Sequence, residues 1–277
     1  MAYEKLGAAP LDYMPCRYGA SKLLFRGPRR DLGGPYVAFL GGTETYGKFI
    51  RRPFPALIEA QLGVPCVNFG WPNAGPDVLL HDSAIVAAAS GATVAVLQVP
   101  GAQNMSNRYF TVHPRRNDRF VQASALLRGI YPEVDFTEFH FTRHMLGMLK
   151  QVAPDRFAVV RRELQCAWVA RMKLLLSRIE APVILLWMAP RAPQDCADAP
   201  GLGWDPPFVT RAMSAALTGP QVTFVEVVYS SAACAEGTRG MAFSQFEANV
   251  AAELPGPAAH DEARDALLPL LMGYFDR

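Results

Sequence analysis

"VAFLGGTETYGKF" (residues 37–49) begins as a short apolar run and breaks at two consecutive glycines, Gly41 and Gly42. A short apolar run that ends at turn residues is typical of a buried strand, and glycines let the chain turn tightly after it. Thr43 follows the turn directly, so a hydroxyl stands where a strand gives way to a helix. This arrangement is one way of presenting a nucleophile to a substrate.

Similar apolar runs recur along the chain, and helical patterns separate them. Strands that alternate with helices predict right-handed crossovers and a parallel sheet covered on both faces. We therefore expect a three-layer α/β/α fold with a five-stranded parallel sheet of the flavodoxin-like type. The predicted strands are residues 36–41, 65–70, 93–101, 182–190 and 222–229, and the predicted helices are residues 53–62, 76–90, 205–217 and 259–274.

Residues 105–180 depart from this alternation, because they carry helical patterns and no clear strand. We expect them to form a mainly helical insertion within a single domain that spans residues 1–277. Two predictions concern helix ends. Asp205 is expected to cap the helix at 205–217, and Pro269 is expected to kink or shorten the last helix.

Composition narrows the class of protein. The chain has 277 residues and a net charge of +2, which is too small by itself to indicate nucleic-acid binding. Its five cysteines form no CxxC pair, so neither a disulfide framework nor a zinc site is expected. No apolar run is long enough for a membrane span, and residues 1–19 lack the apolar core of a signal peptide. We expect a cytoplasmic protein without a cofactor or metal, and the oligomeric state stays open.

Ligands of open parallel sheets bind beyond the carboxyl ends of the strands, so the loops after the predicted strands are where chemistry is expected. Thr43 follows the first strand, Gly70 ends the second, Asn104 follows the third, and His260 opens the last helix. A hydroxyl, a glycine N–H, an amide and an imidazole match the needs of acyl transfer. Those needs are a nucleophile, an oxyanion hole and a base.

In their order and placement these blocks resemble the SGNH (GDSL-type) hydrolase family. "FLGGTETYG" stands where that family has Gly-Asp-Ser, and Gly70 in "VNFGWPNAG" matches its second block. Gly101 with Asn104 stands where the family has Gly-x-Asn-Asp, and His260 precedes the C-terminal helix. The resemblance covers about residues 36–275 and implies a distant member, in a domain family without an assigned function.

The resemblance implies an ester hydrolase or acyltransferase that acts on a polar substrate, either anionic or an O-acylated carbohydrate. Thr43 would attack the ester, His260 would take up the proton, and Gly70 with Asn104 would hold the oxyanion. Each residue also has an ordinary structural interpretation. Thr43 suits a helix N-cap, His260 a surface position near a helix start, and the other two suit turns.

The departures from the family pattern support a second hypothesis. Thr43 replaces the serine, Gly42 replaces the aspartate before it, and Pro257 stands where the family's acid precedes the histidine. Another acid could orient the imidazole, the candidates being Asp195 and Asp205. The alternative is a catalytically silent domain of the same fold, which binds an anionic or glycan ligand in the inherited cleft.

Two sets of side chains are candidates for binding the substrate. One set lies in the turns after the first two strands and consists of Gly42, Glu44 and Asn73. The other follows the third strand and consists of Arg108, Arg115 and Arg116. Guanidinium groups bind carboxylate, sulfate and phosphate through two hydrogen bonds, so these arginines predict an anionic ligand. The alternative is a solvated, ion-paired face.

His140 and His144 are four residues apart, which places both imidazoles on one face of a helix. No carboxylate stands in the HExxH position, so ordinary packing is favoured over a zinc site.

Overall fold

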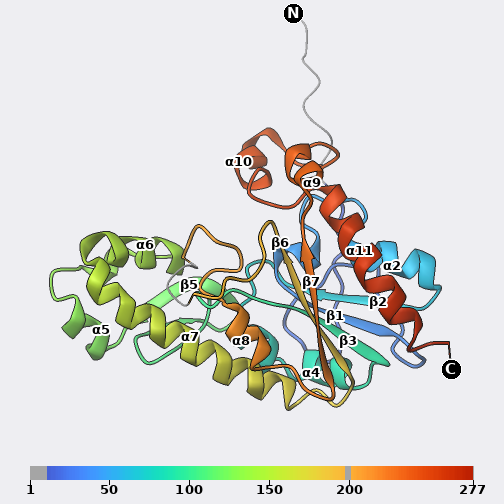
Figure 1. The fold of residues 1–277 in the computed structure, drawn as a ribbon, viewed down its shortest axis with the longest axis horizontal. Helices are drawn as coiled ribbons and strands as arrows, with labels where there is room; N and C mark the ends of the chain where they lie inside the picture. Colours follow the sequence, from blue (N-terminus) through green and yellow to red (C-terminus); the bar gives the residue numbers. More distant parts are fainter. Residues whose placement is uncertain (1–10, 197–200, 277) are drawn as a thin grey trace, which may run out of the picture.

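The computed structural model describes residues 11–196 and 201–276. A five-stranded parallel sheet with the order β2-β1-β3-β6-β7 forms its centre (Figure 1). This order is the flavodoxin-like arrangement of doubly wound sheets. The predicted fold class and all five predicted strands are confirmed. The strands are β1 (Val37–Gly41), β2 (Cys66–Gly70), β3 (Val94–Gln98), β6 (Val183–Ala189) and β7 (Val222–Val228).

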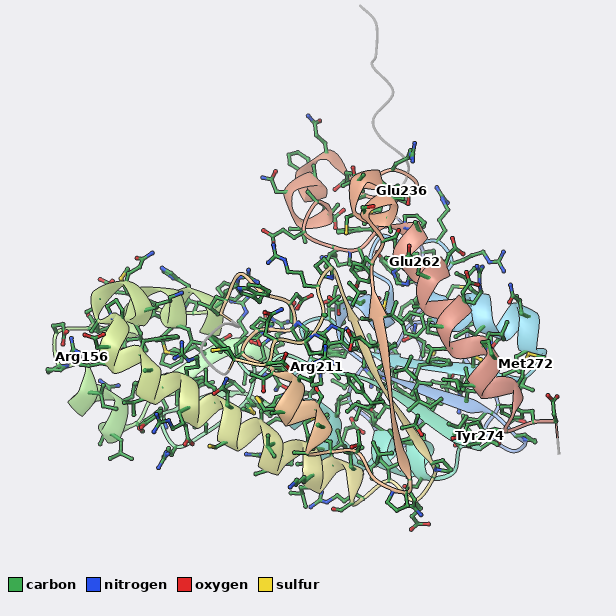
Figure 2. The ribbon with its side chains drawn as sticks, in the orientation of Figure 1. Arg156, Arg211, Glu236, Glu262, Met272 and Tyr274 are labelled. Carbon is green, nitrogen blue, oxygen red and sulfur yellow. The ribbon has the colours of Figure 1, made fainter. Side chains whose placement is uncertain are left out.

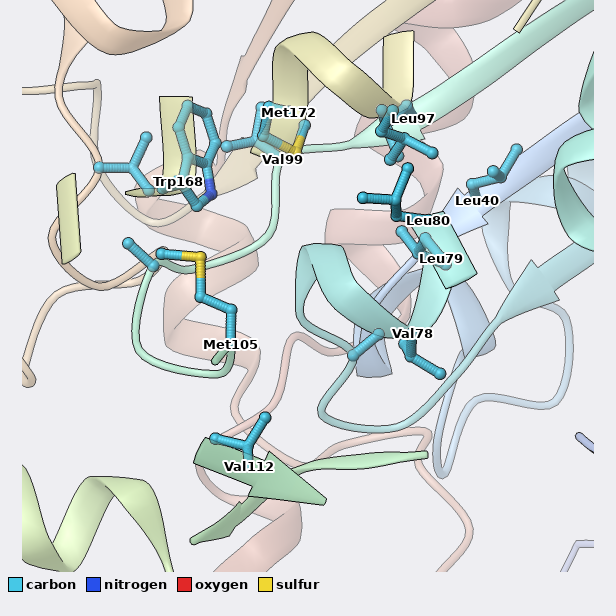
Figure 3. Packing of buried hydrophobic residues seen from close by; sticks show 14 of the residues in the cluster. Leu40, Val78, Leu79, Leu80, Leu97, Val99, Met105, Val112, Trp168 and Met172 are labelled. Carbon is cyan, nitrogen blue, oxygen red and sulfur yellow. The ribbon is translucent and has the colours of Figure 1, made fainter. Parts of the chain in front are cut away.

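A separate apolar core forms on each face of the sheet, because successive side chains of a strand point to opposite faces. Val37 and Phe39 belong to the core beneath α2 and α11. Leu40 belongs to the core beneath α3, α4 and α7, together with Leu97 and Trp168 (Figure 3). These helices are α2 (Phe54–Leu62), α3 (Pro76–His81), α4 (Ser83–Ser90), α7 (Pro154–Leu176) and α11 (Pro257–Met272).

Two predicted helices differ from those observed. The helix expected at 76–90 breaks at Asp82, whose Oδ1 accepts the N–H groups of Ala84 and Ile85 at 3.0 and 3.2 Å. Asp82 therefore ends α3 and caps α4, as aspartate is suited to do. The helix expected at 205–217 shrinks to α8 (Arg211–Ala215), which is capped by Thr210. The expectation that Asp205 caps this helix is therefore wrong.

The last helix continues through Pro269 to Met272. Pro269 is exposed, so water can reach the carbonyl that loses its helical partner there. The proline therefore does not end the helix.

The insertion is mainly helical, but the expectation that it holds no strand is wrong. β4 (Phe110–His113) and β5 (Arg116–Ala123) form an antiparallel hairpin. Polar residues interrupt the pattern of β5, and its register against β4 shifts twice, which hides the strand from a pattern search. Asn117 on β5 is 1% exposed, and its Oδ1 accepts the N–H groups of Gly75 and Val78. The hairpin thus holds the loop that follows β2.

The insertion extends to one side of the sheet, with Arg156 near its far end, while Glu262 and Met272 mark α11 on the opposite side (Figure 2). Within the described ranges, no helix is both long and apolar enough to cross a membrane. Residues 1–10, which the signal-peptide expectation also concerns, lie outside those ranges. The remaining elements are α1 (Thr43–Tyr46), α5 (Ala125–Ile130), η1 (Phe136–Glu138), α6 (Thr142–Val152), α9 (Ser231–Glu236), η2 (Gln245–Glu247) and α10 (Ala248–Ala251).

Candidate functional site

A cleft of about 510 Å³ lies at the carboxyl ends of the parallel strands. Its walls come from the loops that follow β1, β2, β3 and β6, with further residues from α6 and from α10 and the loop after it. Ligands of open parallel sheets bind at this edge. The cleft is therefore the candidate functional site, and each predicted site residue can be located relative to it.

Gln98, at the end of β3, fastens the glycine turn to the sheet. Its Oε1 accepts the N–H groups of Gly42 and Thr45 at 3.1 and 3.2 Å and the hydroxyl of Thr45 at 2.6 Å. Its Nε2 donates to the Glu44 carboxylate at 2.7 Å. One buried amide therefore holds the turn and fixes the orientation of Glu44, which lines the cleft together with Gly42. Sequence reasoning did not identify Gln98, which lies within the apolar run of a strand.

Thr43 lines the cleft, but its hydroxyl is bonded to an amide. The Oγ1 atom accepts the N–H of Asn73 at 3.0 Å and lies 3.5 Å from the Oδ1 atom of the same residue. An amide oxygen cannot take up a proton at neutral pH, so Asn73 holds the hydroxyl without activating it. The N-cap of α1 is Gly42, so Thr43 does not have the alternative role of a helix cap.

His260 is a buried residue of α11 that packs against Phe54 of α2, and it is absent from the residues that line the cleft. Its ring is 1% exposed and stacks on Phe54, and its Nδ1 accepts the backbone N–H of Phe54 at 3.2 Å. Burial lowers the pKa of His260 to about 3, and the positive charge of Arg26 lowers it further. No hydrogen bond among the described residues joins His260 to Thr43. From the sequence, His260 was expected either at the surface or as the base for Thr43. In the structure it is buried and bonded to Phe54.

Gly70 and Asn104 differ in their relation to the cleft. The N–H of Gly70 donates to Asn68 at 2.8 Å inside the protein, so it does not point to a ligand. A Cβ at Gly70 would overlap the backbone of Tyr46, so this glycine permits α1 to lie close against β2. Asn104 does line the cleft, where its Nδ2 donates to the carbonyl of Asn73 at 3.2 Å.

The three predicted anion-binding arginines lie outside the cleft. Arg108 pairs with Glu163 of α7 at 2.5 Å. Arg115 lies in the turn of the β4–β5 hairpin and Arg116 begins β5, and both side chains are exposed. The backbone of the hairpin does lie near the end of β2, because Trp71 Nε1 donates to the carbonyl of Arg115 at 2.8 Å, but the two arginine side chains are exposed and do not line the cleft.

The two predicted acids lie in different places. Asp195 pairs with Arg211 at 3.3 Å on the surface, whereas Asp205 lines the cleft. Burial by the surrounding protein raises the pKa of Asp205 to about 7; the negative charge of Glu44 also raises it, and Arg143 opposes the rise. Neither acid bonds to His260. Among the described residues, no cluster of histidine, cysteine, aspartate and glutamate could hold a metal ion.

A family model described as a domain of unknown function, DUF6473, matches residues 1–275. The chain belongs to the DUF6473 family. A comparison with curated proteins finds no match for this DUF6473 chain.

Solved structures similar to the DUF6473 domain include a lipase, a carbohydrate esterase and a G-D-S-L family structure. The lipase Lip_vut3 from a goat rumen metagenome is 12% identical, with a TM-score of 0.44, over 84% of this chain and 97% of that one. A family two carbohydrate esterase from Clostridium thermocellum is 12% identical, with a TM-score of 0.43, over 92% of this chain and 68% of that one. A G-D-S-L family structure from Desulfitobacterium hafniense DCB-2 is 10% identical, with a TM-score of 0.39, over 84% of this chain and all of that one. The fold assignment rests on the strand order of the sheet.

Several charged residues that line the DUF6473 cleft do not belong to any motif recognised in the sequence. Arg143 comes from α6 in the insertion, Arg191 follows β6, and Glu253 follows α10. Lys48, after α1, also lines the cleft, whereas the nearby basic residues Arg51 and Arg52 do not. Lys48 and Arg191 lie near the ends of predicted strands, and only this placement could have indicated that they line the cleft. Nothing in the sequence around Arg143 indicates that it does so.

Proposed function

We propose that the cleft binds a small, hydroxyl-rich ligand such as a carbohydrate, and that Thr43 and His260 do not act together as nucleophile and base. The observation that carries this proposal is the bonding of the two side chains. Thr43 bonds with Asn73, whereas the Nδ1 atom of His260 accepts the N–H of Phe54. Acyl transfer needs the nucleophile within hydrogen-bond reach of its base. The observed bonds therefore favour a cleft that binds a ligand over a site in which Thr43 and His260 act as nucleophile and base.

The charges in the cleft support a neutral ligand over an anionic one. Acidic and basic side chains both line it, namely Glu44, Asp205 and Glu253 with Lys48, Arg143 and Arg191. An anion site gathers cations at one point, and here acids stand among them. Adjacent donors and acceptors suit hydroxyl groups, because each hydroxyl both donates and accepts a hydrogen bond.

Isothermal titration calorimetry with glucose, cellobiose and myo-inositol tests the proposed ligand class. We expect saturable binding of at least one of these polyols. Asn73→Ala should weaken that binding roughly tenfold, because losing one polar contact costs about 1–2 kcal/mol. The exposed Arg115→Ala/Arg116→Ala double variant is the matched control and should bind with unchanged affinity. Binding of sulfate or glucuronate that the double variant loses, with no binding of polyols, would contradict the proposal.

Turnover of p-nitrophenyl acetate tests Thr43 separately. Removing a nucleophile lowers kcat by several orders of magnitude. We expect Thr43→Ala to change the rate shown by the wild type by less than about tenfold, because the threonine contributes only its bond to Asn73. A variant that loses all turnover while it remains folded would restore Thr43 as the nucleophile.

A further inference from the structure

A second pocket, of about 240 Å³, lies apart from the cleft and shares no lining residue with it. Its walls come from three parts of the chain, which are the segment before β1, the junction of α3 and α4, and the turn of the β4–β5 hairpin. Two of the lining residues, Leu23 and Val78, are apolar and only 2% and 3% exposed. The pocket therefore has an apolar inner wall.

Each of the three parts contributes one exposed basic residue to this pocket, namely Lys22, His81 and Arg115. Within the described ranges, no ion pair and no side-chain hydrogen bond includes the side chain of any of the three. Their donors are therefore free to bind a ligand. Arg115 is one of the arginines for which the sequence predicts an anionic ligand, and the fold places it here with two further basic residues.

The described residues that line the pocket include one acid, Asp82, and its carboxylate already has partners on both oxygens. Its Oδ2 accepts the hydroxyl of Ser21 at 2.6 Å, and its Oδ1 accepts the two backbone N–H groups that it caps in α4. The positive charges of Lys22 and Arg115 outnumber this single negative charge. The pocket therefore favours an anion.

Hydrogen bonds fix the backbone that carries these cations. The N–H of Arg115 donates to the Nδ1 atom of His113 at 3.2 Å, and the carbonyl of Arg115 accepts from Nε1 of Trp71 at 2.8 Å. Lys22 follows Ser21, whose hydroxyl is bonded to the junction of α3 and α4. The fold thus sets the positions from which the cations reach the pocket, which lowers the cost of ordering them around a ligand.

We propose that this pocket binds a phosphate group, either as part of a small organic phosphate monoester or as free phosphate. Lys22 and Arg115 neutralise its charge through charge-assisted hydrogen bonds, and His81 donates a further hydrogen bond. An organic group on the phosphate packs against Leu23 and Val78. The proposal goes beyond the function of the cleft, and it stands whether or not the cleft binds polyols.

Isothermal titration calorimetry with inorganic phosphate and with phenyl phosphate tests the proposal, at low salt because exposed charges are screened least there. We expect saturable binding of both probes. Lys22→Ala and Arg115→Ala should each weaken it roughly tenfold or more, because each removes a charge-assisted hydrogen bond. Arg116→Ala is the matched control and should bind with unchanged affinity. It removes the same charge from the next exposed residue, which does not line the pocket.

The two probes also distinguish the sources of the phosphate. Tighter binding of phenyl phosphate identifies a monoester as the ligand, because its ring uses the apolar wall, whereas equal affinities identify free phosphate.

Three results would overturn the proposal, once circular dichroism has shown the variants to be folded. The first is the absence of binding of either probe. The second is an equal loss of affinity in Arg115→Ala and Arg116→Ala, which would indicate a diffuse positive surface. The third is binding that both pocket variants retain and that Arg143→Ala abolishes, which would place the phosphate in the cleft.

Discussion

His260→Asn should make the free energy of unfolding less dependent on pH between about 6.5 and 3 than it is in the wild type. The wild-type imidazole lies in the core with its pKa lowered to about 3 by burial and by the charge of Arg26. An unfolded chain exposes the same imidazole to water, where its pKa is about 6.5. Below that pH the unfolded chain takes up a proton that the folded chain does not bind.

The wild type should therefore lose stability as the pH falls, by at most roughly 1.4 kcal/mol per pH unit from this one group. Over three units that loss is comparable with the whole stability of many domains, which is about 5–15 kcal/mol. Asparagine removes the titrating group. Its Oδ1 can replace the Nδ1 atom as the acceptor of the Phe54 N–H, so the variant keeps the bond and loses the titration.

Urea unfolding of both proteins at each pH measures this effect. The difference between the two is informative, because Asp205 acts in the opposite sense. Because the pKa of Asp205 is raised in the folded state, the folded chain binds this proton more tightly than the unfolded chain does. The stabilisation that results is present at low pH and is lost as the pH rises through about 7. Loss of the stacking between His260 and Phe54 adds an offset that does not vary with pH. Two curves that run parallel across the acid range would show that His260 is not buried in its neutral form.

Gly70→Ala should destabilise the fold by roughly 3 kcal/mol, although alanine keeps the backbone N–H that an oxyanion hole would use. The reason is space, because the added Cβ would overlap the backbone of Tyr46 and push α1 away from β2. Backbone atoms cannot move aside as a flexible side chain can, so the turn that carries Thr43 must shift as a whole.

Gly129→Ala is the matched control for this substitution. Gly129 lies in α5, and a Cβ there meets no atom within 4 Å. Alanine favours a helix by about 1 kcal/mol over glycine, so this variant should be slightly more stable than the wild type. Thermal or urea unfolding of both variants gives the comparison. A Gly70→Ala protein with wild-type stability and reduced ester turnover would instead support an oxyanion role for the Gly70 N–H.

The strands were predictable because each is short, apolar and bounded by turn residues, and such a pattern is typical of buried strands in parallel sheets. Their alternation with helices then limited the topology to a parallel sheet. The break at Asp82 was a missed signal, since an aspartate inside a helical pattern can cap a new helix. The β4–β5 hairpin was harder to find, because the charged residues of β5 do not alternate with apolar ones in a strict period.

The sequence by itself determined the sheet, the order of its loops and the edge at which the cleft lies, because apolar periodicity and chain connectivity are local properties. It also placed Gly42, Thr43, Glu44, Asn73 and Asn104 correctly at that edge, since all five follow strands. Only the tertiary structure decided the partners of each side chain. Thr43 bonds to Asn73 and His260 to Phe54, which is 206 residues away, so the meeting of these groups depends on how α11 packs against α2. The pKa of Asp205 is likewise raised by the surrounding protein and by the charge of Glu44, neither of which the residues next to it reveal.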